Sequence, residues 1–177
     1  QKIDIYTSNL CNHMCSYCSP KFSSMWETSI NTQGNFDLII SIGGGSVIDM
    51  AKLINILNAQ KDRDLFSYIK NSELMLKKGL PMVAIPTTIG TGSEATHFAV
   101  VYVDKIKYSL AHSFMLPDYV IIDAELSYSL PAYIAASSGM DALSQAVESY
   151  WSVKSTKISK QYAAEAIILN LGVLQDA

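Results

Sequence analysis

The sequence predicts an α/β fold, with a partial parallel sheet followed by the first helices of an all-helical region. Buried-strand patterns run over residues 36–42 and 81–85, and each ends in a loop rich in glycine and hydroxyl residues. Helical periodicity follows the first of these loops. After Pro131 only helical patterns remain. Strands alternating with helices indicate a parallel sheet, so we expect a domain boundary near Pro131.

The composition fits a globular protein and excludes some classes of partner. Of the 177 residues, 49% are hydrophobic and 16% are charged, and the net charge is -3. Because no basic run occurs, we expect no nucleic-acid partner. No stretch reaches the roughly eighteen apolar residues of a membrane helix, and the chain does not start with a signal-peptide pattern. We therefore expect no membrane contact and a cytoplasmic location.

The clearest motif is a strand that runs into a glycine turn and a helix. The strand at 36–42 leads into Gly43, Gly44 and Gly45. We expect the helix to begin at Ser46, with Asp49 completing a capping box. The apolar face of this helix, spaced i, i+3, i+4 and i+7, is predicted to comprise Val47, Met50, Ala51 and Ile54.

Such a turn is suited to binding phosphate. Glycines let the backbone approach a pyrophosphate, and the free N–H groups of the first helical turn point at it. We expect Gly44 to need a backbone angle that only glycine adopts. Ile48 occupies the place of a third glycine, so the motif is not G-x-G-x-x-G. A tight turn that binds no ligand is the alternative.

A second polar loop, Thr87–Glu94, follows the strand at 81–85. Ligands of open α/β sheets bind at the carboxyl ends of the strands. The hydroxyl groups of this loop suit contacts to ribose and phosphate, and the alternative is a plain surface loop. We expect residues 36–42, 82–85 and 119–122 to share one parallel sheet, with both loops at the same edge.

Further elements are predicted along the rest of the chain. Residues 98–103 form a strand of a hairpin that turns at Asp104-Lys105. One helix is expected to begin at Ser138. Ser155 is expected to cap another, which runs towards Leu174.

Four motifs in order resemble the iron-containing (group III) alcohol dehydrogenases: residues 43–52, 86–94, 116–131 and 139–143. The resemblance implies an oxidoreductase that interconverts a small alcohol and an aldehyde with NAD or NADP. It also implies a Rossmann-like domain followed by an all-helical metal domain. On this basis we divide the chain into a segment 1–34, a partial dinucleotide-binding domain 35–131 and a truncated start of the metal domain 132–177.

The resemblance also implies roles for individual residues. Gly43, Gly44, Gly45 and Ser46 would hold the pyrophosphate, with Asp49 nearby. On the nicotinamide side would lie Thr87, Thr88 and Thr91. Lys107 matches a lysine that contacts the cofactor ribose, and a solvated lysine after a turn is the alternative. Residues 138–152 are most similar to phosphonoacetaldehyde reductases within the family.

The metal site departs from the family pattern. Asp141 matches the family's aspartate ligand, but position 145 is Gln where the family has His. A Gln carbonyl is a poorer ligand than imidazole for Fe²⁺ or Zn²⁺. The family's later His would lie beyond Ala177. We therefore expect this chain to bind metal weakly, to be a poor dehydrogenase, and to self-associate through apolar helix faces.

The beginning of the chain carries a different motif. Cys11, Cys15 and Cys18, after a strand expected at 3–6, have a spacing that resembles radical SAM enzymes. That resemblance implies a [4Fe–4S] cluster, and a zinc-binding or inert loop is the alternative. Neither family is fully represented, which favours a fusion of two fragments. Two alternatives to the dehydrogenase therefore stay open: a radical SAM or iron–sulfur fragment, and a non-catalytic nucleotide-binding remnant.

Overall fold

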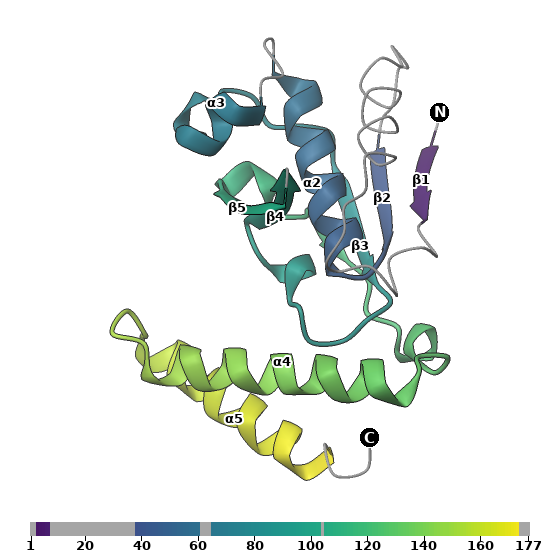
Figure 1. Cartoon of the computed structure of the whole chain (residues 1–177), viewed down its shortest axis with the longest axis vertical. Helices are drawn as coiled ribbons and strands as arrows, with labels where there is room; N and C mark the ends of the chain where they lie inside the picture. The colour runs from purple at the N-terminus through teal and green to yellow at the C-terminus, as the bar shows by residue number, and fades with distance from the viewer. Residues whose placement is uncertain (1–2, 8–37, 61–64, 104, 174–177) are drawn as a thin grey trace. The chain divides into compact units, whose positions relative to one another are not determined.

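The computed structural model describes residues 3–7, 38–60, 65–103 and 105–173. The chain divides into two compact units (Figure 1). The first comprises residues 1–87 and 93–123 and contains the sheet. The second comprises residues 88–92 and 124–177 and contains two long helices.

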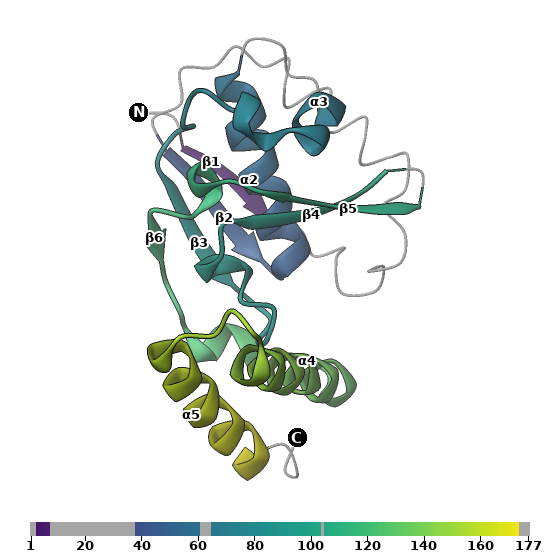
Figure 2. The same cartoon turned by 90° about the vertical axis from the view of Figure 1, so that its left-hand side faces the viewer.

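The sheet of the first unit consists of four parallel strands in the order β1-β2-β3-β6 (Figure 2). Their bounds are Ile3–Thr7, Leu38–Gly43, Met82–Pro86 and Tyr119–Val120. This confirms the predicted parallel sheet, although β6 ends at Val120 rather than Ile122. The strand expected near the N-terminus also exists, and it pairs with β2 in this same sheet.

The pairing of β2 with β3 fixes where their loops leave the sheet. Gly43 is the register partner of Pro86, so both strands end side by side. The glycine turn and the second polar loop therefore start at the same edge, as predicted.

Helix α2 spans Gly45–Ala59, with Gly44 as its N-cap. It begins one residue before Ser46 and has no side-chain cap, so the predicted capping box is wrong. The carboxylate of Asp49 instead accepts hydrogen bonds from Ser93 and Val100. Gly44 has φ −74° and ψ −179°, an extended conformation open to any residue. The expectation of a glycine-only angle at Gly44 is therefore wrong.

Helix α2 is buried on two sides because it packs between two layers. Towards the sheet, Ile48 and Ala51 contact the cluster of Ile39, Met82 and Ala84. A second cluster joins the helix to its other neighbours and contains Leu53, Ile56, Leu57, Tyr68, Met75, Ala99, Val101, Leu110 and Met115. A single apolar face is typical of a surface helix, whereas α2 packs apolar residues on two sides. Val47, Ala51 and Ile54 are buried as predicted, whereas Met50 is only half-buried.

The second layer against α2 is built on a hairpin. Strands β4 (Phe98–Val103) and β5 (Ile106–Ala111) are antiparallel, which confirms the predicted hairpin. Lys105 in the turn has φ 66°, in the left-handed region. Short helix α3 (Leu65–Lys70) was not predicted. In the described part of the chain, 3₁₀ helices complete the connections: η2 (Ser72–Leu74), η3 (Ser93–Ala95), η4 (Ser113–Met115) and η5 (Ala124–Ser127).

The second unit contains α4 (Ala132–Trp151) and α5 (Lys157–Val173), which pack against each other. Helix α4 begins at Ala132 rather than Ser138, because extended Pro131 is its N-cap. Thr156, not Ser155, caps α5: its Oγ1 accepts from the Ser159 N–H at 3.1 Å, and its N–H donates to Ser159 Oγ at 2.8 Å. None of the helices in the described ranges is both long and apolar enough to span a membrane.

Candidate functional site

The glycine turn, Gly43–Ser46, connects β2 to α2. A Cβ added to Gly43 would lie 2.7 Å from the Cβ of Val47, so any side chain there would displace the helix. The first N–H groups of a helix have no acceptor within the helix. The first turn of α2 carries no acidic side chain that would repel an anion. The turn therefore fits a pyrophosphate group.

Thr87 lies next to this turn. Its backbone N–H donates to the Gly43 carbonyl oxygen at 3.0 Å, just after the two parallel strands end. The Thr87 side chain is half-buried. The polar loop Thr87–Ser93 is thus attached at its first residue to the glycine turn.

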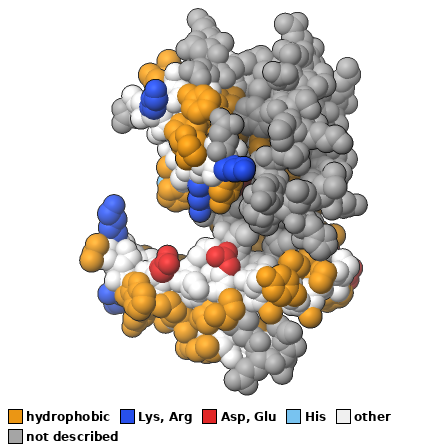
Figure 3. Space-filling model, in the orientation of Figure 1, with side chains coloured by type: hydrophobic (Ala, Val, Ile, Leu, Met, Phe, Trp, Pro, Cys, Tyr) orange, Lys and Arg blue, Asp and Glu red, His pale blue; other side chains and the backbone are white. Residues whose placement is uncertain are grey.

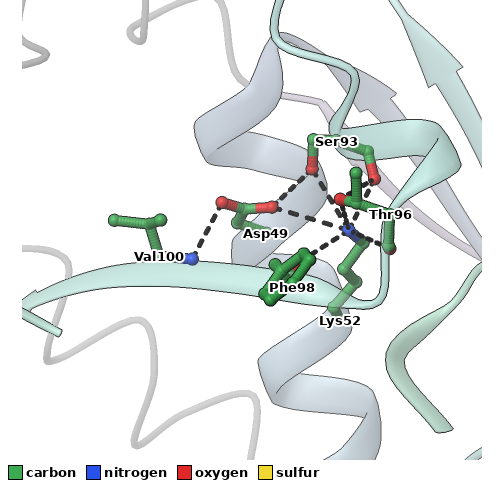
Figure 4. A network of polar contacts seen from close by, with 6 residues as sticks. All are labelled: Asp49, Lys52, Ser93, Thr96, Phe98 and Val100. Carbon is green, nitrogen blue, oxygen red and sulfur yellow. Dashed lines mark hydrogen bonds and ion pairs between the residues drawn. The ribbon is translucent and has the colours of Figure 1, made fainter. Parts of the chain in front are cut away.

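The last residue of that loop is attached to α2 through Asp49 (Figure 4). Ser93 is only 6% exposed, and its Oγ donates a short hydrogen bond to Asp49 Oδ1. The other carboxylate oxygen of Asp49 accepts from the Val100 N–H at 2.9 Å. The two oxygens of Asp49 therefore bind the end of the loop at Ser93 and strand β4 at Val100.

Lys52 is the residue of this region that sequence reasoning missed. Its side chain is fully buried, and its Nζ donates to three carbonyl oxygens: Ser93 at 2.5 Å, Thr96 at 2.8 Å and Phe98 at 2.8 Å. Burial lowers the pKa of Lys52, and Asp49, at 3.7 Å, offsets part of that shift. The sequence did hold a signal, since Asp49 and Lys52 are the two charged residues in a helix that is otherwise largely apolar.

The interior of the loop, Thr88–Gly92, belongs to the second unit and holds Thr88 and Thr91. Gly90 has φ 111° and Gly92 has φ 62°, both in the region that favours glycine. A Cβ on Gly90 would lie 2.2 Å from the Ser138 carbonyl oxygen, and the Gly90 carbonyl accepts from Gln145 Nε2 at 3.1 Å. The loop interior therefore packs closely on α4.

Asp141 and Gln145 lie one turn apart on α4, and both are exposed. Gln145 Nε2 donates to Asp141 Oδ2 at 2.9 Å, so its amide nitrogen, rather than its oxygen, faces the aspartate. Within the described ranges, no three His, Cys, Asp or Glu side chains gather into a group that could hold a metal. These residues do not make a metal site by themselves.

The remaining predicted site residues lie elsewhere. Lys107 is exposed on β5, where its register partner is Tyr102. Cys11, Cys15 and Cys18, with their predicted iron–sulfur cluster, fall outside the described residues.

Comparisons with known proteins agree with this arrangement. The family described as iron-containing alcohol dehydrogenase matches residues 27–124, after the three cysteines. Long-chain-alcohol dehydrogenase 1 of Geobacillus thermodenitrificans is 42% identical over 138 residues, covering 77% of this chain and 35% of that protein. A probable alcohol dehydrogenase of Escherichia coli, EutG, is 39% identical over 136 residues, covering 75% of this chain and 34% of that protein. The chain thus spans about a third of the length of these curated relatives.

Solved structures give a similar result. An iron-containing alcohol dehydrogenase of Thermotoga maritima superposes with a TM-score of 0.78 at 35% identity, covering 87% of this chain and 42% of that one. The sulfoacetaldehyde reductase of Bifidobacterium kashiwanohense, solved in complex with NAD⁺, superposes with a TM-score of 0.78 at 34% identity. The match covers 88% of this chain and 43% of that one.

Proposed function

The chain belongs to the iron-containing alcohol dehydrogenase family, and from this premise we propose that it binds NAD or NADP at the glycine turn and serves the interconversion of an alcohol and an aldehyde. The observation that carries the proposal is the pairing of Gly43 with Pro86. It brings a phosphate-binding turn and the start of a hydroxyl-rich loop to the carboxyl edge of one parallel sheet, where dinucleotides bind in open α/β folds.

The residues assigned to the cofactor have separate tasks in this proposal. The backbone of Gly43–Ser46 binds the pyrophosphate, and the missing side chain at Gly43 leaves the turn close to the helix. A nicotinamide ring, when bound, supplies or accepts the hydride. The contacts of Thr87, Thr88, Thr91 and Lys107 with the cofactor stay predictions that the family resemblance supports.

We propose a short aldehyde with an acidic group as the substrate. Residues 138–152 resemble phosphonoacetaldehyde reductases, and a structural relative is a sulfoacetaldehyde reductase. Phosphonoacetaldehyde and sulfoacetaldehyde share a two-carbon aldehyde with a tetrahedral oxyanion. NADH oxidation should therefore be faster with these aldehydes than with acetaldehyde. Equal or slower rates with the acidic aldehydes would contradict this substrate class.

Among the described residues, Asp141 is the one that the resemblance matches to a metal ligand of the family. We propose Asp141 as a ligand for Fe²⁺ or Zn²⁺. Gln145 binds Asp141 and Gly90 through its amide nitrogen, so we assign it no ligand role. A catalytic metal needs about three protein ligands, and the described residues do not provide them. We therefore expect weak metal binding and slow turnover from this chain, and we assign no reaction step to the metal.

Cofactor binding gives the direct test of the proposed function. Gly44→Val places a branched side chain on the backbone that a phosphate must approach. We expect the Kd for NADH, measured by fluorescence titration, to rise more than tenfold, or about 1.4 kcal/mol. Gly172→Val on α5 is the matched control, because a Cβ at Gly172 meets no atom within 4 Å. It should leave the Kd unchanged.

Three outcomes of this experiment are informative. Equal Kd values for wild type and a folded Gly44→Val chain would show that the turn is only structural. Absence of NADH and NADPH binding by the wild-type chain would contradict the proposal as a whole. Binding without turnover of any aldehyde, with or without added metal, would favour the non-catalytic nucleotide-binding remnant.

A further inference from the structure

The polar loop Thr87–Ser93 is attached at both ends to the strand–turn–helix motif that carries the glycine turn. At its start, the Thr87 N–H donates to the Gly43 carbonyl at 3.0 Å. At its end, Ser93 donates to Asp49 through its hydroxyl and accepts from Lys52 through its carbonyl (Figure 4). Gly43 precedes α2, and Asp49 and Lys52 lie in its first two turns. The position of the loop ends is thereby fixed relative to the turn.

Two charged side chains, Asp49 and Lys52, hold Ser93, and both lie among buried apolar residues. Lys52 is fully buried and Asp49 is 13% exposed by side chain, while neighbours Ile48, Ala51 and Leu53 are buried apolar residues. Burying an ammonium group costs free energy that its partners must offset. Apolar residues of similar size often stabilise a core equally well. The charged pair differs from apolar packing because its hydrogen bonds are directional and hold specific backbone atoms at specific distances.

The partners of the pair show which atoms are fixed. The three carbonyl oxygens that Lys52 contacts come from Ser93, Thr96 and Phe98, and Asp49 accepts from the Val100 N–H. All lie between the end of the polar loop and the first residues of β4. Helix α2 therefore holds one continuous backbone segment, 93–100, through two side chains.

We propose that Asp49 and Lys52 are positioning residues for the dinucleotide: they hold the end of the Thr87–Ser93 loop against the helix of the glycine turn without touching the cofactor. This inference rests on the proposed function. A binding site loses affinity when its contacting groups move by about an ångström from their best positions. Release of the loop end should therefore weaken cofactor binding even though no cofactor contact is removed.

Ser93→Ala is the sharpest test, because it removes the hydroxyl that donates to Asp49 and accepts from Lys52 at 3.3 Å, and it keeps the Ser93 carbonyl that Lys52 also contacts. We expect the Kd for NADH to rise about five- to tenfold, measured well below the unfolding transition. Ser41→Ala is the matched control. Ser41 is also fully buried, but its Oγ has no hydrogen-bond partner among the residues that the structure describes, so its removal should change the Kd less than about twofold.

A conservative variant separates positioning from simple loss of packing. Ser93→Thr keeps the hydroxyl and should restore the Kd to within about threefold of wild type. A folded Ser93→Ala chain that binds NADH like wild type would overturn the inference. So would a Ser93→Thr chain that binds as weakly as Ser93→Ala.

Hydrogen exchange separates failure of this inference from failure of the proposed function. Without cofactor, Ser93→Ala should speed amide exchange in residues 93–100, whereas Ser41→Ala should not. If NADH does not bind to wild type but this acceleration is observed, the proposed function fails and the attachment stands as structural only, which overturns the positioning role. If NADH binds and exchange in 93–100 is unchanged by Ser93→Ala, the positioning inference alone fails.

Discussion

Asp118 shows how one side chain links two segments at the opposite end of β3 from the glycine turn. Its Oδ2 accepts from the Met82 N–H at 3.0 Å, and its Oδ1 forms a short ion pair with Lys78. Burial by itself raises the pKa of Asp118, but the hydrogen bonds from Lys78 and Met82 outweigh it, and the net shift from 3.8 is downward. The charged form is therefore favoured in the folded chain.

The sign of this shift gives a pH dependence. A carboxyl group with a lowered pKa in the folded state adds stability above its unfolded pKa, and this is lost as pH falls through the folded pKa. We expect Asp118→Asn to lower the free energy of unfolding at pH 7 by no more than about 1 kcal/mol, since Lys78 is 47% exposed. Urea unfolding should show this difference shrinking below pH 4. A difference that grows as the pH falls would contradict the assignment.

Residues with local signals could be predicted from the sequence, and residues with distant partners could not. The glycine turn is visible because strand, glycines and helix follow each other directly. The partners of Asp49 lie 44 and 51 positions away, so the sequence suggested a local capping box instead. Lys52 was missed for the same reason, since its three carbonyl acceptors become neighbours only after the hairpin packs on α2.

The loop Thr87–Ser93 depends on two glycines for different reasons. Gly90 has φ 111°, and a Cβ there would lie 2.2 Å from the Ser138 carbonyl oxygen. Gly92 has φ 62°, but its nearest atom would be 3.9 Å away. Gly92→Ala therefore carries only the backbone cost of a left-handed residue, about 1–2 kcal/mol. Gly90→Ala adds a backbone clash and should cost more than about 3 kcal/mol.

Thermal and urea unfolding of both variants would check this order. Each variant is the control for the other, because both make the same substitution in one loop. Equal losses of stability for Gly90→Ala and Gly92→Ala would show that the packing of Gly90 on α4 contributes little.

At the scale of elements, the sequence predicted which strands and helices exist better than where they begin. Periodic patterns gave β2, β3, the hairpin and two long helices. The start of α4 was misplaced because Ser138 looks like a helix start, whereas the helix already begins after its N-cap residue Pro131. Helix α3 was missed because six residues are too few to show a period. The two-sided burial of α2 follows from tertiary packing that no local pattern contains.

The second unit exposes many apolar side chains on its helices. Figure 3 shows apolar groups gathered over α4 and α5. On the C-terminal half of α5, exposed apolar residues are Ile168, Leu169, Leu171 and Val173. Large contiguous apolar patches mark surfaces that associate. We therefore expect the 177-residue chain to associate with further copies of itself at micromolar concentration.

Analytical ultracentrifugation tests this expectation. Ile168→Lys with Leu169→Lys should shift the chain towards monomer and reduce binding of the dye ANS. Ile106→Lys, the same change at an exposed position of the hairpin, should leave the sedimentation pattern unaltered. A wild-type chain that sediments as a monomer at every concentration would show the expectation to be wrong.

A nicotinamide dinucleotide bound at the glycine turn of this chain should protect the backbone there, which hydrogen–deuterium exchange with and without NADH measures. With NADH bound, we expect slower exchange in residues 43–50, because the phosphates would bind the first N–H groups of α2, and in residues 86–93, which begin beside them. Exchange in peptides from α5, and in peptides from β5 that do not contain Lys107, should be unaffected. Saturation with NADH that leaves residues 43–50 exchanging as fast as in the free chain would contradict binding at the glycine turn.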